Sequence, residues 1–220
     1  MALSARVPAS SLLAMQKWSL VVLAGCSFAG VKGSGTAKTE VRQVAAFSAI
    51  ELAGSFDAEV SIGAPRVELS GDDNLLPLIA SDVTGDKLVL RSTQNIRTSL
   101  PLLAKISVPR LTAVKVSGSG GVTLHGVTAD QLTIGLVGSG TVSGDGTAHQ
   151  LSAEVTGSGD IELAKLAVER ATVEISGSGD IEVDATRTLD VRISGSGSVK
   201  YHGNPEIKKS ISGSGGLVKQ

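Results

Sequence analysis

The tripeptide Gly-Ser-Gly occurs six times in the second half of the chain, and this repeat restricts the possible folds more than any other feature. Successive triplets begin 18 to 20 residues apart. Their first glycines are Gly118, Gly138, Gly157, Gly177, Gly195 and Gly213. A near-constant period of this length is typical of repeat architectures, in which each unit packs only against its neighbours. The chain is therefore expected to form a stack of similar coils.

Apolar and polar residues alternate ahead of each triplet. The residue two positions before the first glycine is apolar in every repeat: Val116, Leu136, Val155, Ile175, Ile193 and Ile211. Four positions before it the residue is again apolar, except for Lys209 in the last repeat. Alternation with a period of two predicts a short strand that buries one face and exposes the other.

A second strand is predicted directly after each triplet. Its first inward residue is Val122, Val142, Ile161, Ile181, Val199 or Leu217. The Gly-Ser-Gly triplet then forms the corner between two strands, because glycine accepts positive φ and close backbone approach, and serine forms local hydrogen bonds.

Stacking of the coils is needed because a single coil cannot bury its apolar face. Only 2% of the residues are aromatic, so the interior is expected to be narrow and aliphatic. The variable period lacks a hexapeptide rhythm, which disfavours a left-handed helix built from hexapeptides. The sequence thus predicts an all-β protein, a right-handed parallel β-helix (β-solenoid) with about 18–20 residues per coil.

The segment upstream of the triplets, from Val41 to Arg110, also contains strand patterns, such as residues 56–62 and 87–90. We expect it to form less regular first coils. Residues 74–79 are expected to form a short helical turn or an apolar loop over one end or side of the stack. Near the other end, Lys208, Lys209 and Lys219 would place charge on an exposed sheet edge, which discourages edge-to-edge pairing.

The N-terminal residues have the pattern of an export signal. Lys17 precedes the apolar run Trp18–Gly25, which ends at Cys26 and is too short to span a bilayer. Residues 23–26, Leu-Ala-Gly-Cys, resemble the lipobox of bacterial lipoproteins. This resemblance implies cleavage before Cys26, the only cysteine, and lipidation of its thiol. Translation from Met1 and translation from Met15 both remain open.

Three regions follow from these patterns. Residues 1–25 are interpreted as a lipoprotein signal peptide. Residues 26–40 contain glycine, serine, threonine and lysine without apolar periodicity, and are interpreted as a flexible tether. Residues 41–220 are interpreted as the β-helix domain.

Several motifs make the chain resemble the head GIN domain family, which is named after autotransporter adhesin heads. These motifs are residues 44–50, Gly54-Ser55-Phe56, residues 71–76 (Gly-Asp-Asp-Asn-Leu-Leu), the repeated Ser-Gly-Ser-Gly, and residues 201–205 (Tyr-His-Gly-Asn-Pro). The resemblance implies an exported β-helical protein of bacterial envelopes, often a lipoprotein, and it transfers no catalytic residue.

Charge and histidine spacing narrow the functional classes. The formal net charge is −1, so bulk electrostatics give no reason to expect a nucleic-acid partner. His125 and His202 occupy the same repeat position four coils apart, about 19 Å at a strand spacing of about 4.8 Å, and His149 lies elsewhere in its coil. These histidines are not expected to share a metal, and the glycine-rich segments lack a phosphate-loop pattern. No cofactor is expected.

One group of acidic residues suggests a ligand. The sequence Gly-Ser-Gly-Asp-Ile-Glu occurs twice, which predicts four outward carboxylates on adjacent coils, those of Asp160, Glu162, Asp180 and Glu182. Oxygen ligands of this kind suit Ca²⁺, so a weak cation site is one hypothesis. The other interpretation is a solvated acidic patch screened by salt, with Lys165 or Lys200 nearby.

These inferences favour a non-enzymatic envelope lipoprotein that presents the sides of a β-solenoid for binding, adhesion or envelope organisation. Its expected partners are the membrane, through the lipid at Cys26, and an envelope protein or polysaccharide. The alternative is a polysaccharide-active enzyme on a β-helix scaffold that uses the acidic quartet as acid and base. An accessory role in envelope signalling is a third possibility. The ligand, the membrane leaflet and the oligomeric state stay open.

Overall fold

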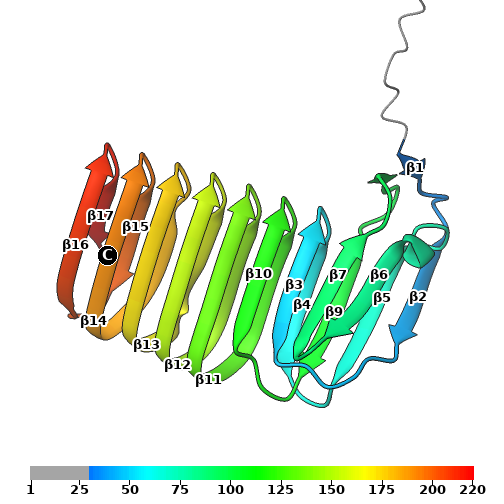
Figure 1. The fold of residues 1–220 in the computed structure, drawn as a ribbon, viewed down its shortest axis with the longest axis horizontal. Helices are drawn as coiled ribbons and strands as arrows, with labels where there is room; N and C mark the ends of the chain where they lie inside the picture. Colours follow the sequence, from blue (N-terminus) through cyan, green and yellow to red (C-terminus); the bar gives the residue numbers. More distant parts are fainter. Residues whose placement is uncertain (1–29) are drawn as a thin grey trace, which may run out of the picture.

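The computed structural model describes residues 30–220, which form one elongated β-solenoid with an irregular cap at its N-terminal end (Figure 1). Nearly all of the described chain outside the turns is strand. The predicted all-β solenoid is therefore confirmed. Within residues 30–220, no helix is long and apolar enough to cross a bilayer. The predicted signal peptide and Cys26 lie outside the described residues.

The regular part of the solenoid contains the six triplets. Each of the strands β11 to β14 begins just after one triplet and ends at the first glycine of the next, so one strand label covers most of a coil. The elements are β10 (Ala113–Gly118), β11 (Gly121–Gly138), β12 (Thr141–Gly157), β13 (Asp160–Gly177), β14 (Ile181–Gly195), β15 (Ser198–His202), β16 (Glu206–Gly213) and β17 (Gly216–Lys219).

The coils stack as parallel strands in the register that the repeat predicts. Val155 pairs with Ile175, which in turn pairs with Ile193, and the side chains of all three are at most 2% exposed. The neighbouring columns are equally buried, so like residues lie above one another through a narrow aliphatic interior. This parallel stacking confirms the central prediction from the sequence.

Each regular coil has three sides, whereas the sequence predicts two strands per coil. In β11 the alternation is interrupted by two exposed pairs, residues 125–126 and 130–131, and a short third side lies between them. Its inward residues on successive coils are Val127, Ala129, Ala148, Leu166, Val168 and Ala185. The register between adjacent coils shifts around this side, so it lacks the constant spacing that a repeat search detects.

The first coils do not follow the order of the sequence. Strands β3 (Ala49–Gly54) and β4 (Asp57–Ile62) pair in parallel with β10 and β11. On their other side they pair with β7 (Lys87–Ser92) and β9 (Leu103–Val108), which come later in the chain. The coil of β3 and β4 is therefore enclosed between β7 and β9 on one side and β10 and β11 on the other. Between β4 and β10 the chain forms most of the cap and then returns beside β3.

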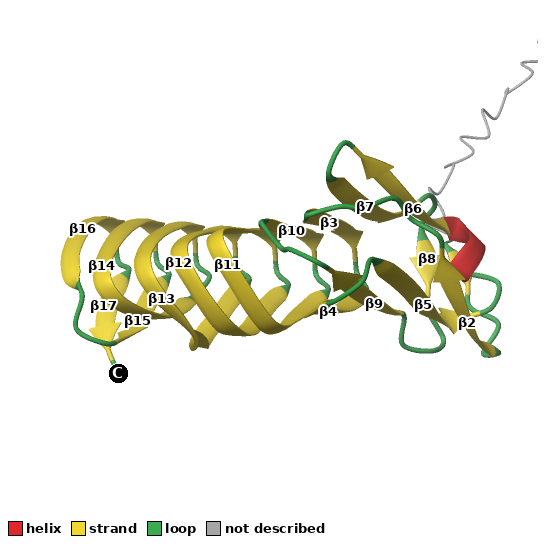
Figure 2. Cartoon of the chain, turned by 90° about the horizontal axis from the view of Figure 1, so that it is seen from below, coloured by secondary structure: helices red, strands yellow, loops and turns green. Residues whose placement is uncertain are grey.

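The cap closes the N-terminal end with antiparallel strands and one helical turn (Figure 2). Its elements are β1 (Val31–Lys32), β2 (Ala37–Arg42), β5 (Arg66–Asp72), the 3-10 turn η1 (Leu76–Leu78), β6 (Ile79–Thr84) and β8 (Ile96–Arg97). β2 pairs with β5, β5 with β9, and β6 with β7, all antiparallel. Leu75 and Leu76 are fully buried. Of the two alternatives expected for residues 74–79, a short helical turn or an apolar loop, the structure contains the helical turn.

The prediction of a flexible tether over residues 26–40 is wrong for the part that the structure describes. β1 pairs with β8, and β2 pairs along its length with β5. These strands carry mostly exposed side chains. Because backbone pairing at the edge of a cap requires no apolar side chains, the segment shows no hydrophobic period. Residues 26–29 lie outside the described part.

At the opposite end, β16 and β17 form the last coil. Lys209 pairs in register with Val191, a residue of the buried column, so a lysine takes an inward position where the column would otherwise continue. Ile207 and Ile211 in the same strand are more than a third exposed. Lys209 itself is exposed, and a charge at such a position on a terminal strand discourages pairing with another chain.

The glycine corners are the points of closest approach between coils. Gly177 has φ +135°, and a Cβ there would lie well inside contact distance of the Gly157 carbonyl oxygen. The same oxygen accepts a hydrogen bond from the Ser178 N–H at 2.8 Å. The first glycine of every triplet has the same surroundings. Only a residue without a side chain allows the corners to stack at the strand spacing.

We predict that Gly177→Ala lowers the free energy of unfolding by about 2 to 4 kcal/mol, because it combines an unfavourable φ with a backbone clash. The matched control is Gly135→Ala, which lies within a strand, where a Cβ would meet only Lys115 Cγ at 3.9 Å. That substitution should be neutral or stabilise by about 0.5 kcal/mol. Urea denaturation measures both, and equal effects would contradict this account of the corners.

Candidate functional site

The four predicted acidic residues lie on two adjacent coils, at the beginning of β13 and around the beginning of β14. Glu162 and Glu182 pair in register, and the quartet lines a hollow of about 120 Å³ together with Lys200. The side-by-side arrangement expected from the repeated hexapeptide is therefore present.

The two aspartates of the quartet bond to the backbone. Asp160 Oδ1 accepts a hydrogen bond from the N–H of Asp180 at 3.0 Å, and Asp180 Oδ1 accepts one from the N–H of Ser198 at 2.9 Å. Asp57 occupies the equivalent position in the coil of β3 and β4, and it accepts a hydrogen bond from Gly121 N–H at 2.7 Å. The aspartates thus link consecutive coils where the strand resumes after the corner.

The glutamates have different surroundings. Glu182 Oε1 lies 2.7 Å from His202 Nε2, and Glu182 pairs in register with Lys200. Among residues 30–220, no group of three or more His, Cys, Asp or Glu side chains is arranged to hold a metal ion. The structure therefore gives the aspartates a structural role, and cation binding stays a prediction.

The other two histidines also face carboxylates. His125 Nδ1 lies 3.8 Å from Asp145, and His149 Nδ1 lies 3.0 Å from Glu169, which also contacts Arg187 at 3.5 Å. The hydrogen bond from His149, assisted by the charge of Arg187, lowers the pKa of Glu169 although partial burial opposes the shift. Each pair is exposed and joins two adjacent coils. Exposed pairs of this kind contribute little to stability.

A buried carboxylate in the cap belongs to the Gly-Asp-Asp-Asn motif. Asp72 is the one charged residue that is buried among those described, at 1% exposure. It accepts backbone hydrogen bonds from Gly35 at 2.7 Å, Ser99 at 2.9 Å and Leu100 at 3.1 Å. A Cβ at Gly33 would collide with this carboxylate. Asp72 therefore holds two separate segments of chain, residues 33–35 and residues 99–100, against the cap.

The next two residues of the motif complete this clamp. Asp73 accepts a hydrogen bond from Ser34 Oγ at 2.5 Å. Asn74 accepts one from Ser34 N–H at 2.9 Å and donates one to the Lys32 carbonyl at 2.8 Å. The sequence identifies this motif only as part of a resemblance. Two adjacent aspartates followed by asparagine are a turn signal, but their partners lie between 27 and 42 residues away, some earlier and some later in the chain.

Desolvation would raise the pKa of Asp72, but the backbone N–H groups of Leu100, Gly35 and Ser99 outweigh it and hold the pKa below its usual value. The pKa of Asp72 is lower in the folded protein than in the unfolded chain, where it is about 3.9. The ionised carboxylate therefore stabilises the fold at any pH above that unfolded value. That stabilisation is lost as the pH falls from there towards the folded pKa.

We predict that Asp72→Asn destabilises the protein at pH 7, because an amide group would face N–H donors and lacks the charge. Urea midpoints measured between pH 7 and pH 3 should show the gap from wild type narrowing below about pH 3.9. The control is Asp130→Asn at an exposed site, which should behave like wild type throughout. A gap independent of pH would show that the charge of Asp72 does not stabilise the fold.

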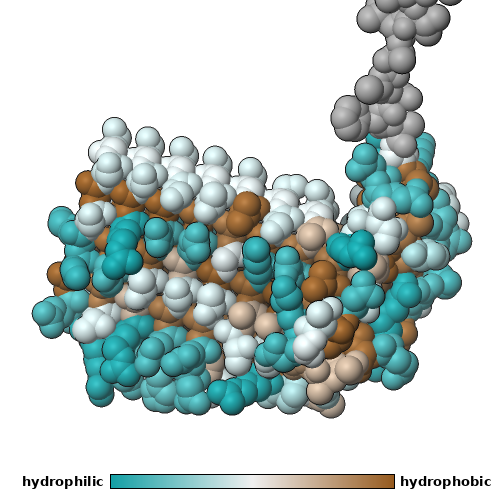
Figure 3. All heavy atoms as spheres, viewed as in Figure 1, coloured by the Kyte–Doolittle hydropathy of each residue, from teal (hydrophilic) through white to brown (hydrophobic). Residues whose placement is uncertain are grey.

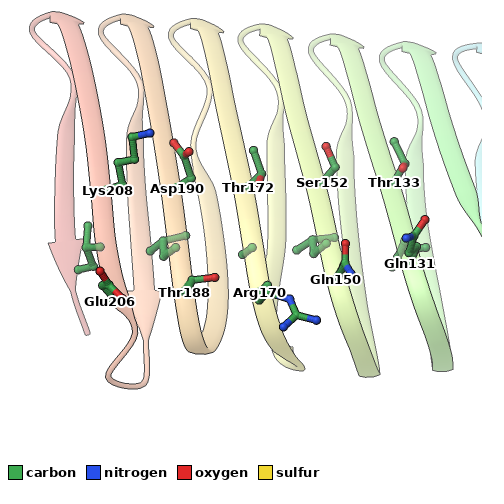
Figure 4. A pocket seen from close by; sticks show the side chains of 15 residues that line it. Gln131, Thr133, Gln150, Ser152, Arg170, Thr172, Thr188, Asp190, Glu206 and Lys208 are labelled. Carbon is green, nitrogen blue, oxygen red and sulfur yellow. The ribbon is translucent and has the colours of Figure 1, made fainter.

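Two long hollows cross the coils. The larger, about 590 Å³, is lined by residues of the short third side, and its charged residues pair with each other or with neighbours, as in His149 with Glu169 and Arg110 with Asp130. The other, about 520 Å³, crosses β11, β12, β13, β14 and β16 and is called the polar groove below (Figure 4). Its polar residues are Gln131, Thr133, Gln150, Ser152, Arg170, Thr172, Thr188, Asp190, Glu206 and Lys208.

The surface repeats from coil to coil. In the space-filling view, side chains of similar hydropathy form rows across the coils, with small residues along the edge formed by the triplets (Figure 3). The polar groove follows the same direction, because its members occupy equivalent positions in successive coils. The sequence contains these polar residues at the period of the repeat. Other outward positions are also polar at that period, so only the bend of each coil identifies the columns that form the groove.

Comparisons with known proteins agree with the fold. The family model described as "Putative auto-transporter adhesin, head GIN domain" matches residues 46–205. A structure described as a "putative adhesin" from Bacteroides fragilis NCTC 9343 is 26% identical, with a TM-score of 0.68, covering 86% of this chain and 99% of that one. A "Putative lipid binding protein" from Parabacteroides distasonis ATCC 8503 is 24% identical, with a TM-score of 0.60, covering 87% and 100%.

Among curated proteins, no match is found. The family match spans most of the described solenoid and ends before the last triplet, which begins at Gly213. It includes the Gly-Asp-Asp-Asn clamp and the first five triplets. The resemblance drawn from the sequence motifs is confirmed, and the chain belongs to the head GIN domain family of "Putative auto-transporter adhesin" proteins.

Proposed function

We propose that this protein is a non-catalytic adhesin of the bacterial envelope, held to a membrane by a lipid on Cys26, that binds its ligand on the side of the solenoid. Family membership supports a surface or envelope location. The observation that carries the binding role is the polar groove, which presents polar side chains at equivalent positions of successive coils, most of them without a side-chain partner in the protein.

The anchor and the clamp together would position the solenoid. The described chain begins at Gly30, and β1 and residues 33–35 are held on the cap by β8 and by Asp72. Four residues span at most about 14 Å, so a lipidated Cys26 would keep the cap close to the membrane. The polar groove is lined by residues of β11, β12, β13, β14 and β16. These strands lie between β10 and the end of the solenoid opposite the cap (Figure 1). Lipidation would therefore leave the groove on the part of the solenoid far from the anchor.

The polysaccharide-active enzyme is the less favoured alternative. A glycosidase needs one carboxyl group as acid and a second as base or nucleophile on either side of the scissile bond. Within the quartet, Asp160 and Asp180 bond to backbone N–H groups, and Glu182 contacts His202. Incubation with polysaccharides and an assay for new reducing ends tests this alternative, and steady release of reducing ends would contradict a purely binding role.

The lipid anchor is tested by Cys26→Ser in the full chain, expressed in a bacterial host grown with radiolabelled palmitate. We predict that the wild-type chain incorporates label and sediments with membranes, whereas the variant does neither. Circular dichroism should show the same β content for both, since Cys26 precedes the described fold. Membrane retention and labelling of the variant would refute anchoring through this residue.

Adhesion is tested with the same strains. Cells that carry the wild-type chain should bind to a polysaccharide-coated or cell-coated surface, or clump, more than cells with Cys26→Ser, because only the anchored protein links two surfaces. Equal adhesion by the two strains would contradict the adhesin function.

A further inference from the structure

The polar groove has a regular composition. Each regular coil contributes one residue to its first column, Gln131, Gln150, Arg170, Thr188 and Glu206, and one to its second column, Thr133, Ser152, Thr172, Asp190 and Lys208. Between the columns lies the inward column of Leu132, Leu151, Ala171 and Leu189, which is buried. Each coil therefore offers a ligand two polar side chains, one on each side of the aliphatic column.

These side chains are free to bond to something outside the protein. The side chains of Gln131 and Gln150 form no hydrogen bond with any other described residue, and the side chain of Arg170 acts only through its charge on the neighbouring Glu169. In the two columns only Asp190 has an ion-pair partner, Arg192 at 3.4 Å. Elsewhere on the solenoid some charged residues are paired, as in Glu51 with Lys87, whereas Glu154 and Glu174 have no such partner. The groove differs in having such side chains at matched positions on five successive coils.

The spacing of the groove suits a polymer. Parallel strands lie about 4.8 Å apart, so five coils present matched polar pairs over about 19 Å. An extended β-linked polysaccharide advances by a similar length for each sugar and carries hydroxyl groups on both edges. A chain lying along the solenoid axis would place one sugar beside each coil and repeat the same contacts.

The charges and the sheet geometry select among polymers. The groove contains two basic residues, Arg170 and Lys208, and two acidic ones, Asp190 and Glu206, so it does not favour a polyanion. Extended peptides usually bind to a free strand edge through their backbone. The groove lies on a sheet face whose strands are paired on both sides from β11 to β14. A peptide strand therefore has no backbone partner there.

We propose that the polar groove binds an extended, β-linked polysaccharide of low charge, parallel to the solenoid axis, with about one sugar per coil. This inference rests on the proposed adhesin function and specifies its ligand class. Because the groove contains no aromatic side chain, affinity comes from polar contacts repeated coil after coil. Binding therefore strengthens with the length of the glycan until the five coils are filled.

The test uses the full chain purified in detergent and isothermal titration calorimetry. The probes are β-1,4-linked oligomers of glucose and of N-acetylglucosamine, from two to six sugars, with α-1,4-linked maltohexaose as a comparison. We expect at least one β-linked hexamer to bind, with affinity rising from dimer to hexamer, and maltohexaose to bind more weakly because its chain is coiled.

Variants locate the binding. Arg170→Ala removes a charged donor from the centre of the groove and should weaken hexamer binding about tenfold. Ser152→Trp fills the groove with a bulky side chain and should abolish binding. The matched control is Glu174→Ala, an exposed charged residue of the same strand β13 that lies outside the groove. It should bind the hexamer as wild type does, and circular dichroism checks that all three variants are folded.

Three results would overturn the proposal. These are failure of every β-linked hexamer to bind, binding that does not increase beyond the dimer, and binding unchanged in folded Arg170→Ala and Ser152→Trp. Capture of an extended peptide in the groove in place of the glycan would also overturn it. If cells still adhere while no glycan binds, the ligand class is wrong and the adhesin function stands. If cells do not adhere, the adhesin function fails independently.

Discussion

The close approach of one coil's backbone to the next, at corners where a side chain cannot fit, underlies the rest of the structure. At each triplet the first glycine takes a positive φ and lies against the carbonyl group of the glycine one coil earlier. The coils therefore keep the spacing of hydrogen-bonded parallel strands. Like residues fall into columns as a result, and these columns form both the aliphatic interior and the polar groove.

A stack of identical coils has two ends with unpaired strands and uncovered core, and the protein treats the ends differently. At the N-terminal end, antiparallel strands and Leu75 and Leu76 cover the core, and the Asp72 carboxylate holds distant segments together by their backbone N–H groups. At the C-terminal end, Lys209 takes an inward position instead of an apolar residue. A covered end and a charged end both limit the addition of further strands.

The features predicted correctly from the sequence depend on strict periodicity. The triplets and the alternating residues before them identify the solenoid and the column of Val155, Ile175 and Ile193, because repeated packing requires repeated residues. The short third side was missed because its register shifts from coil to coil. The insertion of β3 and β4 between later strands was missed because backbone pairing between segments distant in sequence leaves no local pattern.

The same reasoning explains the outcome for the candidate sites. The adjacency of Asp160, Glu162, Asp180 and Glu182 follows from the repeat, but the bonds of the aspartates to backbone N–H groups depend on the corner geometry. The predicted tether failed because edge strands such as β2 are held by main-chain bonds and by side chains of a distant motif. The polar groove emerges only when the bend of the coil is known.

The central claim is that successive coils stack in a fixed register, and disulfide trapping tests it most directly. Thr156 and Ser176 are outward partners on adjacent strands, at a distance that a disulfide can bridge. With Cys26→Ser as background, the pair Thr156→Cys and Ser176→Cys should oxidise readily to one intramolecular species. The pair Thr156→Cys and Glu174→Cys, displaced by two residues, should remain reduced. Equal cross-linking of both pairs, or preference for the displaced pair, would contradict the register on which the core and the groove depend.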